Sequence, residues 1–198
     1  MSNKKIGVLS LQGAFIEHMA SLQKLGVEAL DIRLPRDLET IDGLIIPGGE
    51  STVISQLMRS YGLMEIIRDL ARDGFPMFGT CAGMILMAKS ALDLDIEPIG
   101  AMDIKVKRNA FGRQVDSFET SLAIPALGET PFPAVFIRAP IIVETAPGVE
   151  ILASLPDGTP VAARQGNLLA AAFHPELTPD LRFHSYFLNI VARRAYGH

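Results

Sequence analysis

The first half of the chain alternates between short apolar runs and amphipathic stretches, and this alternation limits the folds open to it. The strand-like runs are 4–13, 27–33, 41–52 (which ends in a Pro-Gly-Gly turn) and 75–80. The stretches with helical character are 14–26, a segment starting at about Ser51, 63–74 and 82–92. Strands that alternate with helices are typical of a parallel, doubly wound sheet.

The second half has a different pattern, because turn residues divide it into short strand-like pieces. These pieces are 99–109, 113–124, 133–145, 149–155, 159–167 and 168–176, and a last helix is predicted over 180–194. Consecutive strands joined by tight turns favour antiparallel pairing. We therefore predict an α/β fold: a single domain over residues 1–198, with a mostly parallel sheet flanked by helices and antiparallel strands added in the second half.

Composition excludes several classes of protein. The chain has 198 residues, 48% of them hydrophobic, 20% charged, with a formal net charge of −4, so a core can form and nucleic acid is not an expected partner. A single cysteine excludes an internal disulfide and fits a reducing compartment. The apolar start is interrupted by Gln12, Gly13, Glu17 and His18, which fits a first strand better than a signal peptide. We expect a soluble, cytoplasmic protein.

The one cysteine, Cys81, lies in the pattern G-x-C-x-G between a predicted strand and a predicted helix. This is the cysteine form of the nucleophile elbow, in which small neighbours permit a tight turn that exposes the side chain. The helix N-terminus favours thiolate over thiol, and the N–H of Ala82 would face an oxyanion. The alternative is a buried, inert thiol, which is common for free cysteine. The elbow alone favours the reactive interpretation only slightly.

A base for this thiol is supplied by the stretch His174-Pro175-Glu176. Pro175 disfavours helix at the preceding residue, so we expect an extended chain in which His174 and Glu176 point to the same side. His174 could then face Cys81 while Glu176 holds the imidazole, as in acyl-transfer enzymes. The other histidines, His18, His184 and His198, are interpreted as satisfied surface or core residues, and no cluster has the spacing of a metal site.

The turn "PGGEST" at 47–52 follows the third predicted strand. Consecutive glycines can present backbone N–H groups as an anion-binding nest, which could complete an oxyanion hole with Ala82. The turn lacks the Lys of a phosphate loop. By itself the turn is better interpreted as an ordinary strand-to-helix turn with Ser51 as helix cap. Together with the elbow and the His-Pro-Glu stretch, the anion site is favoured.

Together these stretches resemble the class I (triad) glutamine amidotransferases, whose fold is flavodoxin-like. The resemblance is closer to the glutaminase subunit of two-component pyridoxal 5′-phosphate synthase. It rests on "GVLSLQGAFIEH", "LIIPGGEST", "PMFGTCAGMI", "RNAFGRQVDSFE", "VFIRAP" and "AAFHPELT". The fourth and fifth motifs are the ones not expected in other triad amidotransferases. These motifs run from residue 7 to residue 178, nearly the whole chain.

The resemblance implies that a triad of Cys81, His174 and Glu176 hydrolyses glutamine to glutamate and ammonia through a γ-glutamyl thioester. It places the oxyanion hole at Gly48, Gly49 and Ala82, and the glutamine-binding positions at Gly48, Gly49, Glu50, Arg108, Ile137 and Arg138. Glu50 would meet the α-ammonium, and Arg108 and Arg138 the α-carboxylate. Alternatively, Arg108 is a solvated strand-end charge and Ile137 a core residue that contributes a backbone group.

The resemblance also implies a partner, a (β/α)₈-barrel synthase subunit that combines the ammonia with ribose 5-phosphate and glyceraldehyde 3-phosphate. The family's assembly has twelve copies of each subunit. No cofactor is expected on this chain, which would not bind pyridoxal phosphate itself. We expect weak activity without the partner, and reorientation of the Gly48–Gly49 peptide is a candidate switch.

The sequence leaves three other interpretations open. One is another enzyme of similar fold, such as a γ-glutamyl hydrolase or an amidotransferase of another pathway. Another is a non-catalytic ligand-binding or redox-sensing module with Cys81 as the sensor, which would not need His174 and Glu176. The last is a structural subunit that keeps the elbow as a relic.

Overall fold

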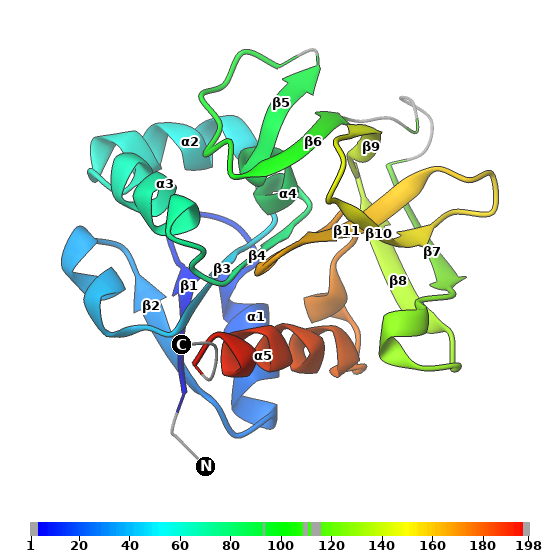
Figure 1. The fold of residues 1–198 in the computed structure, drawn as a ribbon, viewed down its shortest axis with the longest axis horizontal. Helices are drawn as coiled ribbons and strands as arrows, with labels where there is room; N and C mark the ends of the chain where they lie inside the picture. Colours follow the sequence, from blue (N-terminus) through cyan, green and yellow to red (C-terminus); the bar gives the residue numbers. More distant parts are fainter. Residues whose placement is uncertain (1–3, 93, 109–110, 112–115, 196–198) are drawn as a thin grey trace.

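A computed structural model describes residues 4–92, 94–108, 111 and 116–195. Its centre is a seven-stranded sheet with strand order β10-β11-β12-β4-β3-β1-β2 (Figure 1). Its parallel strands are β1 (Lys5–Leu9), β2 (Glu28–Ile32), β3 (Gly43–Ile46), β4 (Met77–Thr80) and β12 (Leu168–Ala171). The antiparallel strands at one edge are β10 (Glu150–Ser154) and β11 (Pro160–Gln165). The predicted α/β class, with a mostly parallel sheet, is confirmed.

Helices cover both faces of this sheet (Figure 1). They are α1 (Phe15–Lys24), α2 (Ser51–Ser60), α3 (Met64–Arg72), α4 (Ala82–Met87) and α5 (Arg182–Ala195). α1 and α5 lie on one face, where His18 and His184 touch, while α2 packs against α4 and α3. The four central strands are almost entirely buried, which explains their nearly continuous apolar sequences. None of the helices in the described ranges is long and apolar enough to cross a membrane.

The remaining strands form two small sheets. β5 (Ala88–Leu92), β6 (Met102–Lys107) and β9 (Ile141–Thr145) form one, and β7 (Ser117–Leu122) pairs with β8 (Phe132–Ile137) in the other. Short 3₁₀ turns lie at η1 (Pro35–Thr40), η2 (Pro125–Leu127) and η3 (Pro175–Leu177). The prediction that the later strands join the main sheet is therefore correct for β10, β11 and β12 and wrong for the others.

The helix predicted over 82–92 is wrong in its second half. α4 ends at Met87, and Ala88 has extended backbone angles (φ −62°, ψ 149°). Residues 88–92 instead pair in parallel with β6. Alanine, lysine and leucine are good helix formers, but pairing with a distant strand overrides this local preference.

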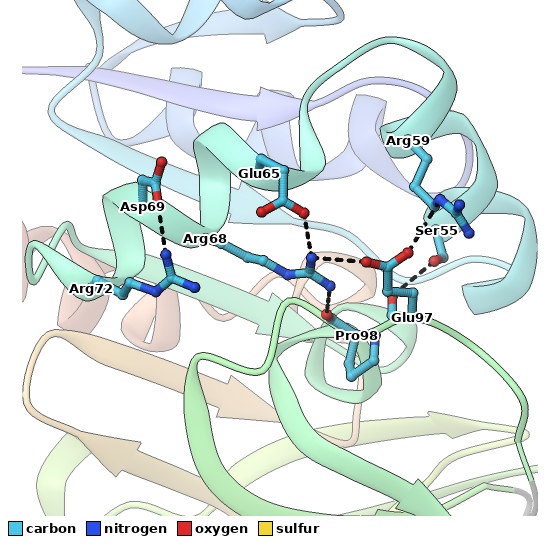
Figure 2. A network of polar contacts seen from close by, with 8 residues as sticks. All are labelled: Ser55, Arg59, Glu65, Arg68, Asp69, Arg72, Glu97 and Pro98. Atoms are coloured by element: carbon cyan, nitrogen blue, oxygen red, sulfur yellow. Dashed lines mark hydrogen bonds and ion pairs between the residues drawn. The ribbon is translucent and has the colours of Figure 1, made fainter.

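A polar network fixes the chain that follows β5 onto α2 and α3 (Figure 2). The Arg68 guanidinium, only 16% exposed, donates to the carboxylates of Glu65 and Glu97 and to the Pro98 carbonyl. Ser55 donates to the Glu97 carbonyl at 2.9 Å. This network therefore anchors the connection that leads into β6.

Candidate active site

Cys81 lies at a strained turn between β4 and α4. Its backbone angles, φ +49° and ψ −104°, are unusual for a residue other than glycine. The adjacent glycines make the turn possible: a Cβ on Gly79 would lie 2.6 Å from the backbone of Gly83, and a Cβ on Gly83 would lie 1.9 Å from the Ile46 carbonyl oxygen. The predicted elbow is therefore present, and it places the thiol at the carboxyl end of β4.

His174 follows β12, the neighbour of β4 in the sheet. Its backbone N–H donates to the Val135 carbonyl at 2.8 Å, and its Nδ1 lies 2.6 Å from Oε1 of Glu176. The predicted contact between the two side chains is confirmed, but the predicted extended backbone is wrong. Pro175–Leu177 forms a 3₁₀ turn that starts at Pro175, a position where the missing N–H of proline costs nothing. The turn brings the carboxylate under the imidazole.

The charges of this pair follow from its surroundings. Burial opposes protonation of His174, but hydrogen bonds to Cys81 and Glu176 outweigh it and raise the pKa of His174 to about 10. Burial also opposes ionisation of Glu176, yet the imidazoles of His18 and His174 hold the pKa of that carboxyl below its usual value. At neutral pH the imidazole therefore keeps its proton and the carboxylate stays charged.

The glycine turn after β3 approaches the same point. A Cβ on Gly48 would lie 2.4 Å from Cε1 of His174 and 3.2 Å from Cβ of Cys81, so glycine is required there. The Gly48 carbonyl accepts from the Ala14 N–H at 2.9 Å. The N–H of Gly49 lies on the opposite side of that peptide unit, and no acceptor for it occurs among the described residues. The first N–H of α4, on Ala82, likewise has no intrahelical acceptor.

Charged groups occupy the outer part of the site. The Arg108 guanidinium lies 3.5 Å from Oε1 of Glu50, and both side chains are partly exposed. Arg138 has a left-handed backbone (φ +42°) and donates its N–H to the Asp116 carbonyl. The carbonyl of Ile137 lies 3.7 Å from Sγ of Cys81. Ile137 thus contributes a backbone group while its side chain is 38% exposed, which contradicts the alternative of a core residue.

These groups surround one pocket with a volume of about 400 Å³, a size suited to a small molecule. It is lined by Gly13, Ala14, Gly48, Gly49, Glu50, Ser51, Cys81, Ala82, Ile85, Arg108, Ile137, Arg138, His174 and Leu177. Every predicted site residue except Glu176 lines it, and Glu176 lies behind His174. Part of the "RNAFGRQVDSFE" motif, residues 109, 110 and 112–115, lies outside the described residues.

Sequence reasoning missed several residues that hold the site in place. Gln12 accepts from the Glu50 N–H at 2.8 Å, and Thr80 accepts from the Gly48 N–H at 3.1 Å. The interpretation of the histidines as satisfied residues is correct for His18, both of whose ring nitrogens have partners, and wrong for His184, whose buried Nδ1 has none among the described residues, while His198 lies outside those residues. His18 also lies 3.4 Å from the Glu176 carboxylate. Only the positions of Gln12 and Thr80, each directly before a motif glycine or cysteine, hinted at such a role.

The sheet with its cysteine elbow is the fold of the class I glutamine amidotransferases. A solved glutamine amidotransferase superposes with a TM-score of 0.90 at 46% identity, covering 94% of this chain and 98% of the other. The solved PurLQS of Thermotoga maritima contains a chain that shares the fold, with a TM-score of 0.69 at 14% identity, covering 96% and 99%.

The chain belongs to the SNO glutamine amidotransferase family, whose model matches residues 8–193. Among curated relatives, the pyridoxal 5′-phosphate synthase subunit PdxT of Moorella thermoacetica is 59% identical over 187 residues, covering 94% of this chain and 99% of the relative. The protein of the same name from Corynebacterium jeikeium is 56% identical over 191 residues, covering 96% and 97%. The resemblance inferred from the motifs is therefore confirmed.

Proposed function

We propose that this chain is the glutaminase subunit of a pyridoxal 5′-phosphate synthase, a single glutaminase domain that releases ammonia from glutamine. The observation that carries this proposal is the meeting of Cys81, His174 and the Gly48–Gly49 turn at one pocket, with Glu176 behind the imidazole. The relatives' name, pyridoxal 5′-phosphate synthase subunit PdxT, supports the choice of synthase.

Glutamine binds as a zwitterion, so its two main-chain charges need opposite charges in the pocket. Glu50 accepts the α-ammonium, while Arg108 and Arg138 bind the α-carboxylate. Since Glu50 and Arg108 already pair with each other at 3.5 Å, the ligand exchanges one ion pair for two and adds no net charge to the pocket. The Ile137 carbonyl is available to accept a hydrogen bond from the side-chain amide nitrogen.

The chemistry then proceeds in two halves. The Cys81 thiolate attacks the amide carbon, and the N–H groups of Gly49 and Ala82 stabilise the oxyanion, with Gly48 holding the peptide. His174 gives its proton to the departing nitrogen, so that the C–N bond breaks, ammonia leaves and a γ-glutamyl thioester remains. His174, now neutral, takes a proton from water, and the hydroxide breaks the C–S bond to release glutamate and regenerate the thiolate. Glu176 stabilises the imidazolium in both halves.

Ammonia released into water would be protonated and lost as a nucleophile. We therefore propose direct delivery to a (β/α)₈-barrel synthase subunit, in an assembly with twelve copies of each chain. A glutaminase without its acceptor wastes glutamine, so activity should depend on docking. The Gly48–Gly49 peptide remains our candidate for the switch, because glycine leaves both orientations accessible.

The test measures glutamate and ammonia formed from glutamine by the wild type and Cys81→Ala, each with and without the synthase subunit. We expect product only from the wild type, and much more of it with the partner. Equal rates with and without the partner would contradict the switch. Absence of product under all conditions would contradict the glutaminase function, and full activation by the synthase of another pathway would contradict the choice of partner.

A further inference from the structure

A second imidazole approaches the proposed triad carboxylate from the side opposite His174. The Glu176 carboxylate has two oxygens, and His174 takes Oε1. The other, Oε2, lies 3.4 Å from Nε2 of His18, and both side chains are fully buried. Apart from this contact, Oε2 has no hydrogen-bond partner among the described residues. A buried carboxylate oxygen without a hydrogen-bond donor lowers the stability of the folded state. It therefore matters whether Nε2 of His18 points a proton or a lone pair at Oε2.

The same nitrogen of His18 also reaches the oxyanion turn. Nε2 lies 3.1 Å from the hydroxyl oxygen of Thr80, the last residue of β4 before Cys81. That hydroxyl oxygen accepts from the backbone N–H of Gly48 at 3.1 Å. One side chain on α1 therefore contacts both the carboxylate behind His174 and the group that holds Gly48.

The surroundings decide which nitrogen of His18 carries the proton. If Nε2 carried no proton, its lone pair would point at the negatively charged Oε2, and the two would repel each other because no water screens them at this buried position. A proton on Nε2 removes this repulsion and is shared between Thr80 Oγ1 and Glu176 Oε2. Nδ1 of His18 is then an acceptor, and Nε2 of His184, 2.9 Å away, must be its donor. Burial lowers the pKa of both imidazoles, that of His184 to about 3, so both are neutral.

This assignment leaves two groups without a partner among the described residues, and one of them is the Thr80 hydroxyl proton, because the Thr80 oxygen then accepts from both His18 and Gly48. Nδ1 of His184 is buried and has no partner in the described part of the chain. With the proton on Nε2, this atom is a bare acceptor nitrogen. The reverse assignment would leave a buried N–H without an acceptor and set the His18 lone pair against Glu176. The reverse assignment would, however, let the Thr80 hydroxyl donate to Nε2 of His18, so each arrangement leaves one unpaired donor, and the repulsion between the His18 lone pair and Glu176 decides between them.

We propose that His18 is a positioning residue of the glutaminase site, whose Nε2–H holds the Glu176 carboxylate and, through Thr80, the oxyanion turn, while His184 fixes its tautomer. The proposal rests on the proposed function. His18 touches neither substrate nor the reacting atoms. It acts by orienting the carboxylate toward His174 and by holding Gly48 in its position next to Cys81.

The first test does not depend on activity. Nitrogen-15 spectra of histidine-labelled wild type at neutral pH should show His18 and His184 neutral, each with its proton on Nε2. A proton on Nδ1 of His18 would overturn the proposal even if the chain is an active glutaminase. If the tautomers are as expected but no glutamate forms with the synthase subunit present, the proposed function fails and the structural assignment stands.

The second test uses kinetics with the synthase subunit bound. His18→Leu replaces the imidazole by an apolar side chain and so removes the hydrogen-bond donor. We expect kcat to fall roughly tenfold to a hundredfold with KM nearly unchanged, because such losses are typical when an orienting partner is removed. His18→Gln, whose amide can return a donor near the position of Nε2, should recover much of this loss. Leu22→Ala, one turn further along α1 and buried but without a side-chain hydrogen bond to the network, controls for destabilisation.

The outcomes separate positioning from packing. If His18→Leu keeps the wild-type kcat, or if Leu22→Ala loses as much kcat as His18→Leu at equal folded fraction, His18 serves packing only and the proposal is overturned. If His18→Leu fails to fold, the comparison rests on His18→Gln. A rate for that variant no higher than that of Glu176→Ala would overturn the proposal as well.

Discussion

Nδ1 of His174 lies 2.6 Å from Oε1 of Glu176, although only Pro175 separates the two residues along the chain. The 3₁₀ turn that begins at Pro175 makes this contact, and the carboxylate is buried beneath the imidazole. The pair is therefore built into one short segment of the chain, and His18 on α1 contacts the carboxylate from outside that segment.

Replacing Glu176 by Gln keeps the size of the side chain and removes its charge. The amide can turn its NH₂ group toward Nδ1 of His174, and this donor favours the tautomer in which Nδ1 carries no proton. The neutral amide also no longer stabilises the imidazolium. We expect kcat for glutamate release to fall roughly 10²- to 10⁴-fold, with KM little changed. Thr178→Ser, a neighbouring buried position whose hydroxyl donates to the Pro175 carbonyl, is the control and should keep nearly full activity.

The raised pKa of His174, about 10, predicts the basic limb of the pH profile. Loss of the imidazolium proton removes the acid that protonates departing ammonia, so activity should fall as the pH rises through about 10. Because the folded pKa lies above the ordinary histidine value of 6.5, His174 itself contributes stability that is complete below about pH 6.5 and is lost as the pH rises through about 10. Glutamate release, followed between about pH 6 and 11, is the measurement, since ammonia escapes at high pH.

Cys81 is one cause of this raised pKa, so its removal should lower it. In Cys81→Ala, nuclear magnetic resonance titration of the His174 ring should give a pKa clearly below that of the wild type. In Gly100→Ala, which leaves the site intact, the pKa should not move. An unchanged His174 pKa in Cys81→Ala would show that the thiol and the imidazole do not interact.

Gly83 is required by the elbow, because a Cβ there would overlap the backbone carbonyl oxygen of Ile46. Gly83→Ala should therefore lower the free energy of unfolding by about 3 kcal/mol or more, as for severe overpacking. Gly100 has a positive φ of 70° but open space around it, so Gly100→Ala should cost only about 1–2 kcal/mol of backbone strain. Urea unfolding of both variants tests the difference, and equal losses would contradict the elbow geometry.

The Arg68 network predicts a contrast between two arginines on α3. Arg68 is 16% exposed and binds two carboxylates and a carbonyl, whereas Arg72 is 72% exposed and binds Asp69. Arg68→Met should lower Tm by roughly 2–4 °C, and Arg72→Met should leave it within about 1 °C. Similar shifts for both would show that the network does not anchor the segment at Glu97.

Sequence reasoning found the parts of the site whose chemistry is local. The glycines around Cys81, the Pro-Gly-Gly turn and the two-residue offset from His174 to Glu176 are each visible in one short stretch. The positions that it missed depend on packing between distant elements. His18 meets Glu176 only because α1 lies beside the turn at 175–177, and residues 88–92 become a strand only because β6 pairs with them. Nothing in the local composition of either segment predicts these contacts.

We expect Cys81 to form a γ-glutamyl thioester during turnover, and intact-protein mass spectrometry after a rapid acid quench would detect this adduct. With saturating glutamine and the synthase partner present, we expect a fraction of the chain to be heavier by one γ-glutamyl group, which maps to the peptide with Cys81 and is absent from Cys81→Ala. Glutamate release that continues in Cys81→Ala, with no adduct on the wild-type thiol, would contradict this expectation.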